Sequence, residues 1–132
     1  PVRGISDGEY RYLRNLLPEE LYIEKHLMGL KGNAVLNNPY WSTWVRDSWE
    51  NAHTYKLVKR YMRRPAEQLY HTTSDPYEMN NLANDPSQSK RLAKLRTELE
   101  RWMKDQGDPG IPMDTFKTYH AAKAGKHLYK AK

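Results

Sequence analysis

The stretch 68–83 (QLYHTTSDPYEMNNLA) most constrains what this chain can fold into. Its Leu-Tyr pair suits a pleated, half-buried surface, which favours a strand. Asp75 can cap a helix with its carboxylate, Pro76 fits the first helical position because it has no N–H to lose, and Glu78 completes a capping-box pattern. The stretch therefore predicts a strand, a sharp turn and a one-turn helix. It also predicts a structural role for these residues, since any strand-to-helix corner could use them.

A hairpin is predicted over residues 2–14. Asp7-Gly8 lies between two short arms, 2–6 and 9–14, and Asp-Gly in that position is a strong signal for a two-residue turn. Because side chains alternate along a strand, the second arm should present two different faces. One face carries Tyr10, Tyr12 and Arg14, and the other carries Arg11 and Leu13.

The most regular helical pattern covers residues 85–106. Asp85 is placed to cap this helix, Pro86 opens it and Gln88 holds the third position, while Gly107 is a natural stop. An apolar stripe at helical spacing should pack against the sheet. The stripe consists of Leu92, Leu95, Leu99, Trp102 and Met103.

Residues 40–63 also favour a helix, because their tryptophans and aliphatic residues lie near helical spacing. Asn51 or His53 marks a break within it, and residues 55–59 could instead form a strand. We expect the tryptophans to pack inside the protein rather than to form a surface on which sugar rings stack.

Two other stretches lack a regular pattern. Prolines, glycines and asparagines interrupt residues 15–40, where only 21–30 could hold a short helix. Residues 108–132 form a lysine-rich tail with few apolar anchors. We expect this tail to lie over another surface or to be partly disordered.

Composition bounds the class of protein. A chain of 132 residues suits one small domain, and a mean hydropathy of −1.00 leaves few apolar residues for its core. Its 10 Tyr and 4 Trp are half-polar rings that fit a subdomain packed against a larger neighbouring domain.

The net charge of +6 favours an anionic partner, and the lack of cysteine excludes disulfides and thiolate chemistry. No apolar run is long enough to span a bilayer, and the start lacks a Met and a signal-peptide core, as in the interior of a longer chain.

Over roughly residues 1–112 the chain resembles a known family. The cues are RGISDGEYRYLRN at 3–15, KRYMRRPAEQLY at 59–70 and the Asp-Pro corner. Together they resemble the C-terminal subdomain of sulfatases, in particular the heparan N-sulfatase (N-sulfoglucosamine sulfohydrolase) group. Gln68 and His71 depart from the family pattern, which usually has Glu and Asp at these positions.

The resemblance implies an α+β fold, with a small antiparallel sheet packed against a long C-terminal helix and a helical insertion. The implied domain covers residues 1–107, followed by a basic tail at 108–132. Within the domain the expected parts are a hairpin at 2–14, a loop and helical insertion at 15–64, a strand and Asp-Pro corner at 65–84, and a helix at 85–106.

Sulfatases use a formylglycine made within a C/S-x-P-x-R motif and hold a calcium ion with Asp and Asn side chains. This sequence contains no C/S-x-P-x-R, and no catalytic or metal-binding residue is assigned in it. The resemblance therefore implies an N-terminal catalytic domain that carries the formylglycine and calcium. The parent would hydrolyse sulfate esters or sulfamates on sulfated saccharides, with heparan sulfate and glycosaminoglycan degradation favoured, in a periplasmic, secreted or lysosomal location.

Four basic residues are candidates for lining the substrate cleft: Arg11, Arg14, His26 and Lys31. Arg suits sulfate because it forms forked, charge-assisted hydrogen bonds. Each of the four also fits an ordinary ion-paired or solvated surface position. An alternative is a nucleic-acid- or polyanion-binding module, given the basic run at 56–64 and the tail. No zinc pattern, RNP-like run or recognition helix supports nucleic acid, so it is disfavoured.

Overall fold

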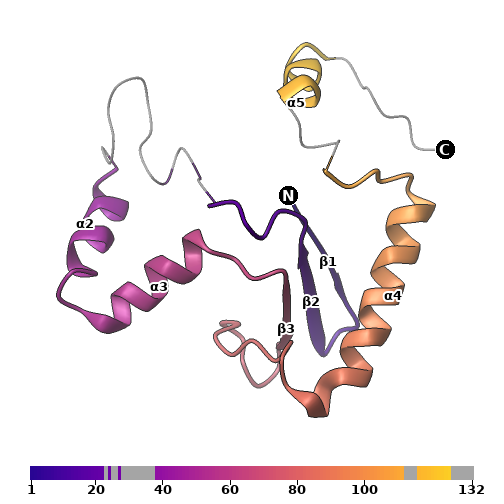
Figure 1. The fold of residues 1–132 in the computed structure, drawn as a ribbon, viewed down its shortest axis with the longest axis horizontal. Coiled ribbons are helices and arrows are strands. Elements are labelled where there is room, and N and C mark those ends of the chain that lie inside the picture. The colour runs from indigo at the N-terminus through magenta and orange to yellow at the C-terminus, as the bar shows by residue number, and fades with distance from the viewer. Residues whose placement is uncertain (23, 25–26, 28–37, 112–115, 126–132) are drawn as a thin grey trace. The chain divides into compact units, whose positions relative to one another are not determined.

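The computed structural model describes residues 1–22, 24, 27, 38–111 and 116–125. The chain divides into two compact units (Figure 1). The first combines Pro1–Leu17 with Pro65–Lys132, and the second is Pro18–Arg64. The helical insertion is thus a unit of its own, flanked in sequence by the two halves of the sheet-containing unit.

The first unit contains an antiparallel sheet with the strand order β1-β2-β3 (Figure 1). The strands are β1 (Val2–Ser6), β2 (Tyr10–Asn15) and β3 (Glu67–His71). The predicted hairpin is confirmed, but its reversal falls on Gly8 and Glu9, one residue later than expected, because Ser6 pairs with Arg11. Gly8 has a φ of +97°, which favours glycine.

The long helix α4 (Ser89–Asp105) follows a 3₁₀ turn, η1 (Pro86–Gln88), and packs on the sheet. Asp85 caps this start by accepting a hydrogen bond from the Ser87 N–H, as predicted. The buried core joins residues of both elements: Tyr10, Tyr12, Leu69, Leu92, Leu95 and Leu99. Three leucines of the predicted stripe are therefore buried on the sheet.

Trp102 is the exception to that stripe, because its side chain is 50% exposed. Met103, one residue further along, packs against the core instead. A helix advances about 100° per residue, so when Met103 points inward Trp102 turns toward solvent. The helix ends at Asp105, and Gly107, the predicted stop, follows two residues later with a φ of +66°.

The Asp75 corner differs from the prediction, because it contains no helix. The Asp75 carboxylate accepts hydrogen bonds from the N–H groups of Met79 and Asn80, at 2.9 and 2.7 Å. Glu78 has a left-handed φ of +55°, so the chain turns where a helix would continue. Its side chain pairs with Arg11, and the predicted capping box is therefore wrong.

The Asn81 side chain fastens this corner to strand β3. Its Oδ1 accepts hydrogen bonds from the N–H groups of Leu69 (2.9 Å) and Ala83 (3.0 Å), and its Nδ2 donates to the Glu67 carbonyl at 3.1 Å. One side-chain amide thus satisfies two backbone groups of β3, the edge strand of the sheet opposite β1.

The second unit contains α2 (Pro39–Asp47) and α3 (Ala52–Met62). This confirms the helices predicted over 40–63, with Asn51 as the break and N-cap of α3, and excludes the strand at 55–59. Trp41 and Val58 form its small core, whereas Trp44 and Trp49 are exposed. The possible helix at 21–30 lies largely outside the described residues.

In the described part of the basic tail, Phe116–Lys123 forms the short helix α5, which the sequence did not predict. Across the described ranges, every helix is too short or too polar to cross a bilayer.

Candidate functional site

The candidate site is a depression of about 460 Å³ at one end of the sheet, around Arg14 of β2. Arg14 is the cross-strand partner of Glu67 on β3, and Arg96 reaches the same place from α4. The lining residues are Arg14, Asn15, Leu16, Ala66, Glu67, Arg96 and Ile111. Three segments far apart in the sequence therefore bring two arginines and a carboxylate together.

Glu67 is the centre of a hydrogen-bond network in this depression. Arg96 donates from Nε and Nη2 to both carboxylate oxygens of Glu67, at 2.8 and 2.7 Å, and the Tyr12 hydroxyl donates to Oε1. The Arg96 guanidinium holds the pKa of Glu67 below its usual value, and Glu67 raises the pKa of Arg96 in turn. Burial, aided by Glu67, raises the pKa of Tyr12 to about 12. All three groups thus keep one protonation state near neutral pH, which suits a fixed scaffold rather than acid–base catalysis.

Arg14 is the group in this depression that is best placed to bind a ligand. It donates to Glu100 at 2.8 Å, but its side chain is 38% exposed and that of Glu100 is 52% exposed. Exposed ion pairs of this kind stabilise a protein by only about 0–1 kcal/mol. An anionic ligand could therefore replace Glu100 at little cost in stability.

Arg11, the other predicted site residue that the structure describes, does not join Arg14. Arg11 lies on the opposite face of β2, since side chains alternate along a strand, and it pairs with Glu78 at 2.7 Å. His26 and Lys31 lie outside the described residues. The cleft role of all four remains a prediction.

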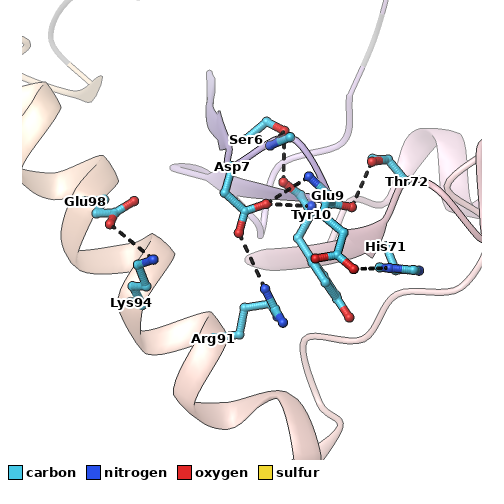
Figure 2. Close-up of polar contacts among 10 residues, drawn as sticks. Ser6, Asp7, Glu9, Tyr10, His71, Thr72, Arg91, Lys94 and Glu98 are labelled. Carbon is cyan, nitrogen blue, oxygen red and sulfur yellow. Dashed lines mark hydrogen bonds and ion pairs between the residues drawn. The ribbon is translucent and has the colours of Figure 1, made fainter.

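A second polar cluster surrounds the hairpin turn and was not anticipated (Figure 2). The Arg91 guanidinium of α4 lies over the face of the Tyr10 ring and near Asp7, while His71 of β3 contacts Glu9. The sequence holds one sign of a basic surface at this place. Lys90 and Lys94 are four residues apart, so they lie on the same side of the helix, next to its apolar stripe.

The carboxylates of this unit predict a dependence of stability on acid pH. The pKa of Glu67 is lowered by Arg96, that of Asp108 by Arg3, and that of Asp7 by the Tyr10 N–H. A carboxyl whose pKa is lowered on folding stabilises the protein above its unfolded pKa, and this stabilisation disappears as the pH falls through the folded pKa. Stability should therefore fall progressively below about pH 5.

Glu67→Gln tests the origin of that dependence. Because Glu67 and Arg96 are partly exposed, we expect the variant to lose only about 1 kcal/mol near neutral pH. Its urea-unfolding free energy should also fall less steeply than that of the wild type between about pH 5 and about pH 3. Parallel curves for the two proteins would show that Glu67 contributes nothing to the acid response.

Comparison with known proteins connects this geometry to a class of enzyme. No protein-family model matches the chain. Two ulvan-active sulfatases of Formosa agariphila are 31% identical over 118 residues and 32% identical over 123 residues, which is 81% and 89% of this chain. Human N-sulphoglucosamine sulphohydrolase is 25% identical over 118 residues, or 84% of the chain. The chain spans only 17–21% of the length of these relatives.

A small antiparallel sheet covered by a long helix is an α+β arrangement consistent with a sulfatase C-terminal subdomain. Most of this chain is similar to a part of these sulfatases, which confirms the resemblance to sulfatases seen in the sequence.

Proposed function

We propose that this chain is the C-terminal subdomain of a sulfatase and that an N-terminal catalytic domain carries out the hydrolysis. The observation that supports this is a match over most of the chain that covers about a fifth of each relative. The proposal assigns the formylglycine and the calcium ion to the catalytic domain, because this sequence has no C/S-x-P-x-R. The described residues likewise hold no group of three or more His, Asp or Glu side chains fit to bind a metal.

The proposed substrates of the parent are sulfated saccharides, cleaved at sulfate esters or sulfamates. The human relative is named for N-sulphoglucosamine and the two bacterial relatives for ulvan. We favour the N-sulfoglucosamine type because of the resemblance of residues 3–15 and 59–70 to that group. A polysaccharide substrate also fits the proposed periplasmic, secreted or lysosomal location.

The proposed role of this subdomain is to help form the wall of the substrate cleft. Arg14 can exchange its exposed partner Glu100 for a sulfate group, while the Glu67–Arg96 pair holds the floor of the depression in place. Arg is suited to sulfate because its guanidinium forms two parallel charge-assisted hydrogen bonds.

Steady-state kinetics of the complete protein test both the proposed sulfatase activity and the proposed cleft role of Arg14. The complete protein would be expressed from the reading frame that encodes this chain. Sulfate release would be measured from an N-sulfated heparin oligosaccharide and from an ulvan oligosaccharide. We expect release from the N-sulfated substrate, and we expect Arg14→Gln to raise KM by roughly tenfold with little change in kcat, because the contact is made in the ground state as well.

Arg101→Gln is the matched control, because it removes the same charge from an exposed position on α4 outside the depression. Unchanged KM in Arg14→Gln, or equal changes in both variants, would contradict the cleft role of Arg14. A complete protein that releases sulfate only from ulvan would contradict the N-sulfoglucosamine preference.

A further inference from the structure

A basic groove of about 430 Å³ lies along the start of α4. It shares no lining residue with the Arg14 depression. The lining residues are Ser87, Gln88, Lys90, Arg91 and Lys94. Every one of them can donate a hydrogen bond, three are cations and none is a carboxylate, so the groove presents donors and positive charge together.

Arg91 is held in place in this groove but makes few hydrogen bonds. Its guanidinium carbon lies 3.7 Å from the centre of the Tyr10 ring, a cation–π contact that fixes the plane of the group. Its Nη1 lies 3.5 Å from Asp7 Oδ2, a long ion pair, and its buried Nε has no hydrogen-bond partner within the described part of the chain. The side chain is still 37% exposed, so its outer edge can reach a ligand.

The neighbouring residues keep Tyr10 beneath Arg91. The Tyr10 ring packs against the His71 ring, with centroids 4.6 Å apart, and His71 Nε2 contacts Glu9 Oε1 at 2.9 Å (Figure 2). Arg96 on the same helix differs sharply from Arg91, because two short hydrogen bonds to Glu67 occupy it. Of these two arginines, Arg91 is therefore the one whose donors can serve an anion.

Two of the groove's cations have carboxylate partners outside its lining. Asp7 lies 3.5 Å from Arg91 and its Oδ1 already accepts hydrogen bonds from the N–H groups of Glu9 and Tyr10. Glu98 lies 4.0 Å from Lys94, on the next turn of α4 (Figure 2). Asp85 also lies beside the groove, where its Oδ1 accepts a hydrogen bond from the Ser87 N–H at 2.9 Å. The lining itself carries three cations and no carboxylate, so the surface that a ligand would touch is positive.

We propose that this groove binds sulfate groups of a sulfated polysaccharide and so anchors the polymer to the subdomain. The identity of the polymer rests on the proposed function, whereas the affinity for anions rests on the groove itself. Hydroxyl and amide donors beside the cations suit both sulfate and sugar hydroxyl groups. The lining contains no aromatic ring on which nucleic-acid bases could stack, which favours a polysaccharide over single-stranded nucleic acid.

Binding of the 132-residue chain to a heparin hexasaccharide, measured by calorimetry, tests the groove. Lys90→Gln/Lys94→Gln should raise the Kd by roughly tenfold, because two charge-assisted contacts are lost. The matched control Arg101→Gln/Lys104→Gln removes the same charge from exposed positions further along α4 and should change the Kd by less than about twofold. Arg91→Lys should also weaken binding, because lysine lacks the planar fork that lies on Tyr10.

Three outcomes would overturn the proposal. Equal weakening by both double variants would show attraction by overall charge alone. Unchanged binding to a desulfated hexasaccharide would exclude sulfate as the recognised group. Tighter binding to duplex DNA than to the hexasaccharide at the same salt would assign the groove to nucleic acid.

The same variants separate this inference from the proposed function. A complete protein that releases sulfate while Lys90→Gln/Lys94→Gln binds the hexasaccharide like the wild type would contradict only the groove. Selective binding of the sulfated hexasaccharide by a complete protein without sulfatase activity would contradict only the proposed function.

Discussion

Leu95→Asp is expected to unfold the sheet-containing unit. Leu95 is 0% exposed and belongs to the core with Tyr12 and Leu69, which are equally buried. Truncating a buried leucine alone costs about 2–5 kcal/mol, and an unpaired carboxylate in that position adds a further penalty of several kcal/mol. Because small domains are stable by only about 5–15 kcal/mol, the sum should remove most of the folded state.

Circular dichroism on heating measures this effect. Ala93→Asp is the matched control, because it introduces the same carboxylate at an exposed position on the same helix. The control should melt like the wild type, while Leu95→Asp should lack a cooperative transition. A Leu95→Asp melting curve that matches the wild type would contradict the packing of α4 on the sheet.

Asn81→Ala is expected to release the outer edge of β3. The variant leaves the Leu69 N–H and the Glu67 carbonyl without their side-chain partner. Each buried backbone group that loses its partner costs about 1–3 kcal/mol. We expect a loss of about 2–3 kcal/mol in the free energy of unfolding, since Asn81 is only partly buried and water can replace some of the contact.

Hydrogen exchange gives this prediction a local readout. The Leu69 amide should exchange much faster in Asn81→Ala than in the wild type, because its hydrogen bond is to the Asn81 side chain. Asn80→Ala, at the exposed neighbouring position, should leave that amide protected. Full protection of the Leu69 amide in Asn81→Ala would mean that the side chain is not its partner in solution.

The elements that the sequence predicted well are those that local rules determine. The hairpin follows from Asp-Gly between alternating arms, and α4 follows from its leucine spacing. Asp85 caps the 3₁₀ turn that leads into α4, rather than α4 itself. Asn51 was recognisable as a break because asparagine is a favoured N-cap residue.

The Asp75 corner was predicted wrongly because one pattern fits two structures. Asp75 and Glu78 at this spacing satisfy a capping box, but an aspartate can equally hold a loop by accepting from later N–H groups. The left-handed φ of Glu78 decides between them, and no local signal reveals it, since that conformation is uncommon for a non-glycine residue.

The polar clusters depend on contacts between residues distant in the sequence. Glu67 meets Tyr12 and Arg96 only after the strands pair and α4 packs on them. In the same way, only the tertiary fold places Arg91 on Tyr10. The sequence could therefore name Arg14 as a candidate and place it on the opposite face of the strand from Arg11. It could not show that Arg14 lies beside the Glu67–Arg96 pair.

Sulfate release by two proteins, measured under identical conditions with calcium, decides whether this chain is a non-catalytic part of a sulfatase. One protein is the 132-residue chain, and the other is the complete protein that contains it. We expect the complete protein to release sulfate from a sulfated saccharide and the chain alone to release none. Metal-dependent sulfate release by the chain alone, or no release by the complete protein from any sulfated saccharide tested, would contradict this expectation.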